Sequence, residues 1–281
     1  MKIARIASVA AVVAALAAPG IARTAPDVRA IPLSAPAPSW YTSELHRQVL
    51  AAGTTGVAVP GSAAIPTSSL AFAGIRPGQQ LIISGGGGFS LCTSNFVFRN
   101  GSNYAIGTAG HCGGVGDSVT LIALGKVLFN IGSIIKSVDQ GPGNDFALIS
   151  IKPAFNRNVS PSMAHWGGPV AAWGGPGAPL MVKHSGWGTG IGAGGTPRVG
   201  IGLTWASSGL WTFAGAIMLG DSGSAATAGD NRAVGNITHI LLTIPHRNAG
   251  TSISRILQIA GLPLATCRNP LPWPGFGCPS L

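Results

Sequence analysis

Acidic side chains are so scarce in this chain of 281 residues that each one calls for an explanation. Asp145 is the least expected, because it opens the apolar run "NDFALISI" (144–151), where a partly buried carboxylate is costly without a partner. An imidazole suits that role, since a carboxylate fixes its tautomer and stabilises its charged form. The other acids lie in turns, in the N-terminal region or directly before a serine: Asp27, Glu44, Asp117, Asp139, Asp221 and Asp230.

Among the six histidines, His111 is the best placed to be that partner. It follows the strand-like run "YAIGTAG" (104–110) and immediately precedes Cys112, which could tie the turn back to Cys92 and hold the ring in position. We expect three other histidines to be ordinary surface or core residues: His46, His165 and His246.

The sequence predicts neither a metal site nor a cofactor. Outside the N-terminal region only five acids remain, too few for a calcium or magnesium cage of several carboxylates. No C-x-x-C or H-x-x-x-H spacing occurs, which makes zinc a poor alternative. The run Gly85–Gly88 is not a phosphate loop, because neither Gly-Lys-Ser/Thr nor a helical pattern follows it.

Three short motifs place a histidine, an aspartate and a serine in that order along the chain. "TAGHC" (108–112), "NDFALI" (144–149) and "GDSG" (220–223) together resemble the chymotrypsin-like serine proteases. "GIRPGQ", "CTSNFVF" and "VKHSGWGTG" are similar to segments of the actinobacterial secreted branch that includes the streptogrisins. The resemblance covers roughly residues 70–262.

The resemblance implies a catalytic role for each of these residues. Ser222 would attack a carbonyl carbon, and His111 would take its proton and later pass it to the leaving group. Asp145 would hold His111 in the required tautomer. The backbone N–H groups of Gly220 and Ser222 would form the oxyanion hole.

Asp221 would have a structural task in such a protein. The resemblance implies that it is buried and needs a cationic partner, which in the streptogrisin-like branch is an internal arginine. At the matching position this chain has His184, next to Lys183. We expect protonated His184 or Lys183 to pair with Asp221, and the alternative is that both side chains are exposed to solvent.

The resemblance also locates a substrate pocket. Six residues before the serine, at the base of that pocket, stands Ala216, so cleavage after Lys or Arg is not expected. Thr238, His239 and Ile240 would line the wall that pairs with the substrate backbone, and Gly250 would leave the opposite wall open. A branched residue at the position of Ile240 would narrow the entrance and favour small or medium apolar residues.

Short apolar runs bounded by glycine-rich turns position these residues and predict an all-β sandwich or pair of barrels. With the resemblance, the expected fold is two packed six-stranded antiparallel β-barrels and a C-terminal helix in "TSISRILQIAG" (251–261). Thr251 or Ser252 would be its N-cap, and Gly261 lies just past its end. The expected units are a signal peptide (1–22), a pro-segment or linker (23–69), an N-terminal barrel (70–172), a C-terminal barrel (173–250) and a helix with a disulfide-closed tail (251–281).

The N-terminus indicates export. Lys2 and Arg5 precede a short apolar run, and small residues ending at Ala22 suit signal-peptidase cleavage, after which no stable membrane insertion is expected. Four cysteines fit an oxidising compartment, and of the three pairings we prefer Cys92–Cys112 and Cys267–Cys278. The net charge of +10 comes from scattered cations, so no specific nucleic-acid partner is expected.

We therefore expect a secreted, monomeric serine endopeptidase that acts on proteins or peptides. The main alternative is a catalytically inactive binding protein on the same fold, which the unusual pocket wall and the changed partner of Asp221 favour. A secreted esterase is less favoured, because the G-x-S-x-G elbow and the Ser-Asp-His order of α/β-hydrolases are absent.

Overall fold

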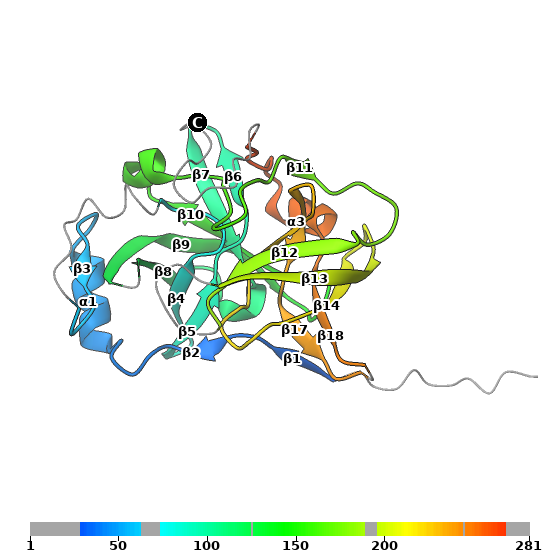
Figure 1. Cartoon of the computed structure of the whole chain (residues 1–281). Helices are drawn as coiled ribbons and strands as arrows, with labels where there is room; N and C mark the ends of the chain where they lie inside the picture. Colours follow the sequence, from blue (N-terminus) through cyan, green and yellow to red (C-terminus); the bar gives the residue numbers. More distant parts are fainter. Residues whose placement is uncertain (1–28, 63–73, 125, 189–195, 244, 268–281) are drawn as a thin grey trace, which may run out of the picture.

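Two β-sheets and two α-helices make up the part of the chain that the computed structural model describes, residues 29–62, 74–124, 126–188, 196–243 and 245–267 (Figure 1). Within these ranges, no helix is long and apolar enough to cross a membrane. The fold confirms the predicted all-β class with a C-terminal helix.

The N-terminal sheet has the strand order β2-β5-β4-β8-β9-β10-β7-β6, with β3 paired to β9. Its neighbours are antiparallel, and the short helix η1 (Gly110–Cys112) follows β7. The strands are β2 (Ala35–Pro36), β3 (Val57–Ala58), β4 (Gln80–Gly85), β5 (Gly88–Thr93), β6 (Val97–Asn100), β7 (Asn103–Thr108), β8 (Ser118–Ala123), β9 (Val127–Asp139) and β10 (Asp145–Ile151).

The C-terminal sheet has the order β1-β17-β18-β14-β13-β12-β15-β16-β11. A second short helix, η2 (Pro153–Asn158), precedes β11 along the chain. The strands are β1 (Ala30–Pro32), β11 (Ala171–Ala172), β12 (Met181–Gly186), β13 (Thr196–Trp205), β14 (Leu210–Gly215), β15 (Ala225–Ala228), β16 (Arg232–Asn236), β17 (His239–Leu241) and β18 (Arg247–Thr251).

The number of strands corrects the prediction. Each sheet has nine strands rather than six, and the pair β11–β16 is parallel rather than antiparallel. Three of the additional strands, β1, β2 and β3, come from residues 29–62, which we call the N-terminal segment. They are only two or three residues long, and they form because an existing sheet offers free backbone groups to pair with.

The N-terminal segment runs along both sheets rather than away from them. Figure 1 shows it passing from β1, beside β17 and β18, through β2 to the helix α1 (Ser43–Ala51) at the outer end of the molecule. Leu45 and Val49 lie one helical turn apart on α1 and are buried against the N-terminal sheet, with Ile82 and Leu128. The helix begins where Thr42 Oγ1 accepts a hydrogen bond from Leu45 N, at 3.2 Å.

The C-terminal helix α3 (Ile253–Ala260) confirms the predicted signals at both ends. Ser252 is its N-cap, with Oγ accepting from Arg255 N at 3.4 Å, and Gly261 ends it in the left-handed conformation at φ +67°. Ile253 and Ile256 are buried in an apolar cluster that also contains Phe98 and Phe146 of the N-terminal sheet. The helix therefore packs where the two sheets meet.

Candidate active site

His111 stands between a carboxylate and a hydroxyl. Its Nδ1 lies 2.6 Å from Asp145 Oδ2, and its Nε2 lies 2.6 Å from Ser222 Oγ. His111 belongs to η1, Asp145 begins β10, and Ser222 lies in the loop between β14 and β15, so both sheets contribute. With Nδ1–H donating to the carboxylate, Nε2 is free to accept the proton of the Ser222 hydroxyl. The sequence placed these three residues in one site, and the structure brings them together.

Asp145 is fully buried and is held from both sheets. Its Oδ1 accepts hydrogen bonds from the backbone N–H groups of Gly110 and His111, the second at 3.1 Å. From the C-terminal sheet, Thr251 Oγ1 accepts from Asp145 N at 2.9 Å, and Asn236 Nδ2 donates to Asp145 O at 2.9 Å. The carboxylate is therefore compensated in the buried site and fixed in orientation toward His111.

Two glycines shape the loop that carries Ser222. Gly220 and Gly223 have φ values of +99° and +91°, a region that favours glycine. A Cβ at Gly223 would lie 2.2 Å from the carbonyl oxygen of Thr93, so a side chain there would push the loop away from the N-terminal sheet. Thr93 N in turn donates to Ser222 O at 2.7 Å, and Gly223 N donates to Ile237 O at 2.8 Å. The loop that carries Ser222 is thus attached to both sheets.

The disulfide Cys92–Cys112 joins β5 to η1 and closes beside this loop. Its Cα atoms are 6.4 Å apart, which lies within the usual range for a disulfide. It anchors the residue that follows His111 to the strand that ends at Thr93. Cys267 is buried, and its predicted partner Cys278 lies outside the described residues, so that pairing stays a prediction.

Arg198 is the partner of Asp221, which corrects the prediction of His184 or Lys183. Its guanidinium donates to both carboxylate oxygens of Asp221, from Nη1 to Oδ2 and from Nη2 to Oδ1, the latter at 3.2 Å. The same carboxylate accepts from Gly188 N at 2.7 Å and Met218 N at 2.8 Å. Both members of the ion pair are buried, so each needs the other.

The two residues that the sequence favoured have other partners. Burial lowers the pKa of His184 to about 4, so the ring is neutral at neutral pH and cannot supply the charge, and its Nε2 donates to Ala216 O at 3.1 Å. Lys183 Nζ donates to Gly229 O at 3.0 Å and to Asn231 Oδ1. Arg198 stands directly opposite His184 in the β12–β13 pairing, one strand away from the position that the sequence pointed to.

The predicted pocket residues lie near the site in different surroundings. Thr238 and His239 are buried, Ile240 is half-buried and Ala216 is exposed. Gly250 is buried, and a Cβ there would lie 1.7 Å from the carbonyl oxygen of Asn236, so this glycine serves close packing rather than an open wall.

The sequence missed that His239 also faces the buried carboxylate. Its Nδ1 lies 3.6 Å from Asp145 Oδ2 and 2.9 Å from Thr238 Oγ1, and its ring meets that of His111 edge-on at 5.4 Å between centroids. Burial lowers the pKa of His239, partly offset by the charge of Asp145. Ligand atoms of His111, Asp145 and His239 lie within 4.8 Å of one another, so these three could hold a metal ion if the hydrogen bonds between them were given up.

A scan against protein-family models finds no match for this chain, and a search of curated proteins finds none either. Among solved structures, the chain is similar to Thermobifida fusca protease A, at 23% identity and a TM-score of 0.48 over 68% of this chain and 98% of that one. It is also similar to Cellulomonas bogoriensis chymotrypsin, at 22% identity and a TM-score of 0.48 over 68% of this chain and 100% of that one. A third similar structure is Nocardiopsis protease, at 21% identity and a TM-score of 0.44 over 68% of this chain and 100% of that one. At these identities and TM-scores the likenesses assign neither a family nor an activity to the chain.

Proposed function

We propose that this protein is a secreted serine endopeptidase that cleaves peptide bonds through an acyl-enzyme on Ser222. The observation that carries the proposal is the continuous hydrogen-bonded line from Asp145 through His111 to Ser222, with 2.6 Å at each step. A nucleophile within hydrogen-bond reach of a base that is itself oriented by a third group is the arrangement that nucleophilic catalysis requires.

The chemistry follows from which atom can hold the proton. His111 Nε2 takes the proton of Ser222 as Oγ attacks the substrate carbonyl carbon, and gives it to the leaving amine. Asp145 stabilises the imidazolium that forms between these steps, because its Oδ2 faces Nδ1. A water molecule activated by the same nitrogen then hydrolyses the ester on Ser222.

The backbone N–H groups of Gly220 and Ser222 are proposed to stabilise the oxyanion of the tetrahedral intermediate. Arg198 supports this role indirectly, because its ion pair with Asp221 fixes the residue between the two donors. Losing one such donor typically costs about 2.7–4 kcal/mol of transition-state stabilisation. The arginine also removes one reason for favouring an inactive binding protein, since Asp221 has its cationic partner after all.

The proposed specificity is for small or medium apolar residues before the scissile bond. Ala216 offers no carboxylate to a basic side chain, and Ile240 brings a branched apolar side chain to the proposed wall. Secretion is proposed from the signal-like residues 1–22, which lie outside the described residues, and the disulfide Cys92–Cys112 supports an oxidising compartment.

The test is digestion of a diverse peptide pool, read by mass spectrometry, alongside labelling with a serine-directed phosphonate. We expect the wild-type protein to cleave after apolar residues and to be labelled at Ser222, and the Ser222→Ala variant to do neither. The proposal is contradicted if folded wild-type protein and a folded Leu33→Asp variant, in which the N-terminal segment is loosened, both fail to cleave peptides and to react with the phosphonate. The inactive binding protein would then be the remaining interpretation.

A further inference from the structure

Residues 29–33 lie in the proposed active site as a substrate would. Strand β1 pairs antiparallel with β17, with Ile31 opposite Ile240 and Pro32 opposite His239. Leu33 N donates to Thr238 O at 3.0 Å, and Leu242 N donates to Arg29 O at 2.9 Å. The chain's own backbone therefore occupies the edge that was predicted to pair with the substrate backbone.

The carbonyl oxygen of Leu33 is hydrogen-bonded to the loop that carries Ser222. Gly220 N, one of the two proposed oxyanion donors, donates its hydrogen bond to Leu33 O. Ser222 follows two residues later, with its Oγ 2.6 Å from the base. The peptide bond between Leu33 and Ser34 is thereby presented to the group that would cleave it.

The side chain of Leu33 fills an apolar site. It is fully buried, at 0% exposure, although its neighbours Pro32 and Ser34 are not buried. It belongs to the apolar cluster of the C-terminal sheet that includes Phe213 and Ile237, against which Ile240 also packs. A medium-sized apolar side chain before the scissile bond is the preference proposed above for substrates.

The chain is also held beyond that bond, on the other sheet. Ala35 pairs with Leu91 of β5, and Ala37 N donates to Phe89 O at 3.0 Å. Figure 1 shows β1 and β2 leading from the C-terminal sheet to the N-terminal sheet along one edge of the molecule. Both sides of the Leu33–Ser34 bond are thus fixed, which favours attack over dissociation.

We propose that the Leu33–Ser34 bond is a substrate of the protein's own Ser222, and that residues 29–33 block the active site until it is cut. This proposal rests on the proposed endopeptidase function. Ser222 Oγ bonds to the carbonyl carbon of Leu33 while His111 Nε2 takes the hydroxyl proton. The Leu33–Ser34 bond then breaks, and the proton passes to the new amino group of Ser34. Water hydrolyses the ester, which leaves a carboxylate on Leu33 and restores Ser222.

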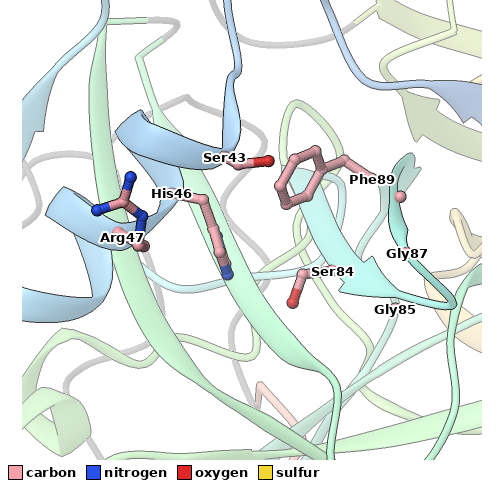
Figure 2. A pocket seen from close by; sticks show the side chains of 8 residues that line it. Ser43, His46, Arg47, Ser84, Gly85, Gly87 and Phe89 are labelled. Carbon is pink, nitrogen blue, oxygen red and sulfur yellow. The ribbon is translucent and has the colours of Figure 1, made fainter.

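The cut protein would begin at Ser34 and keep the rest of the N-terminal segment. Helix α1 stays attached through Leu45 and Val49, and Tyr41 Oη lies 2.9 Å from Thr120 Oγ1 of β8. Figure 2 shows His46 of α1 directed toward Ser84 and Phe89 of the β4–β5 hairpin, where a cavity of about 350 Å³ lies between helix and sheet. This places the new N-terminus well before residue 70, where the resemblance begins.

The first measurement follows the N-terminus of the purified full chain over time, by intact mass and N-terminal sequencing. We expect a fragment beginning at Ser34 in the wild-type protein and none in Ser222→Ala. We also expect a rate constant that does not change with protein concentration, because the bond is cut within its own molecule. A Ser34 terminus in Ser222→Ala, or a rate proportional to concentration, overturns the proposal.

Two matched leucine variants of the N-terminal segment test the assignment of Leu33. Leu33→Asp places a carboxylate in the apolar site, so we expect cutting at this bond to slow by about 100-fold, the scale on which such pockets discriminate. Leu50→Asp makes the same change on the exposed face of α1, where Leu50 is 42% exposed, and should cut at the wild-type rate. Equal rates in the two variants overturn the assignment.

Phosphonate labelling separates failure of this proposal from failure of the proposed function. Because Leu33→Asp weakens the blocking segment, its Ser222 should be labelled at once, whereas uncut wild-type protein should be labelled only as cutting proceeds. Labelling and peptide digestion by a wild-type chain whose Leu33–Ser34 bond stays intact would overturn self-cleavage alone. No labelling in any of these proteins would overturn the endopeptidase function itself.

Discussion

Asp145 and Asp221 are two fully buried carboxylates, and their partners set their tasks apart. Each accepts two backbone N–H hydrogen bonds and is hydrogen-bonded to one nitrogen-bearing side chain from another element. Asp145 faces His111, whose other ring nitrogen reaches the hydroxyl of Ser222. Asp221 faces Arg198, whose guanidinium donates to both carboxylate oxygens and has no acceptor. An imidazole that also contacts a hydroxyl makes the first pair suited to proton transfer, and a guanidinium that only donates hydrogen bonds makes the second pair a structural support.

The largest effect should come from removing the charge of Asp145. In Asp145→Asn the side-chain amide can donate a hydrogen bond to His111 Nδ1. This favours the tautomer with the proton on Nε2, which cannot accept the proton of Ser222. We expect kcat to fall about 10⁴-fold, as such a change does in serine proteases with this arrangement. Steady-state kinetics on a cleaved peptide measures this, with thermal unfolding to show that the fold is kept. A drop of less than tenfold would mean that Asp145 does not orient the base.

Breaking the other pair should act mainly on stability. Arg198→Met keeps much of the side-chain volume and leaves the charge of Asp221 buried and unpaired, so we expect the free energy of unfolding to fall by about 3–5 kcal/mol. Denaturant unfolding measures the loss. Arg198→Lys is the matched control, since it keeps a cation and should recover part of the stability. An unchanged midpoint in Arg198→Met would show that the pair contributes nothing.

Lowering the pH should destabilise the protein through His184, which lies opposite Arg198 in the β12–β13 pairing. Its pKa is lowered in the folded protein to about 4, from 6.5, chiefly by burial. The unfolded chain therefore binds the additional proton between these values, so stability falls as the pH drops from about 6.5 toward 4, by about 3 kcal/mol at the lower end. His184→Gln keeps a donor for Ala216 O and should flatten this part of the pH–stability curve. A variant curve as steep as that of the wild type would assign the slope to other groups.

The smallest effect is expected for the second histidine near Asp145. His239 Nδ1 lies 3.6 Å from Oδ2, beyond hydrogen-bond distance, and its lowered pKa keeps the ring neutral at neutral pH. His239→Gln should therefore change kcat by less than about tenfold, the size of a contact worth under about 1.4 kcal/mol. The same change at His111 removes the base and should abolish turnover. Equal losses at the two histidines would mean that both serve Asp145.

What the sequence could predict depends on whether the information is local. The ends of α3 could be predicted because the capping residues Ser252 and Gly261 act within one helical turn. The motifs around His111, Asp145 and Ser222 likewise predicted residues that the structure brings together. The partner of Asp221 was predicted wrongly because it depends on the strand register that sets Arg198 opposite His184. Strand β1 has no periodicity of its own in three residues, and it exists only because β17 offers an edge.

The hydrogen bonds between Asp145 and the C-terminal sheet have a consequence for copies of the protein that begin to unfold. Thr251 and Asn236 hold the backbone of Asp145 from across the junction, and Ser222 also comes from the C-terminal side, so any parting of the two sheets breaks these hydrogen bonds and separates Ser222 from His111. Under the proposed function, a copy whose sheets begin to part would lose its activity together with the alignment of Ser222 and His111. Damaged molecules would thus be available for digestion by intact neighbours without being able to digest them in return.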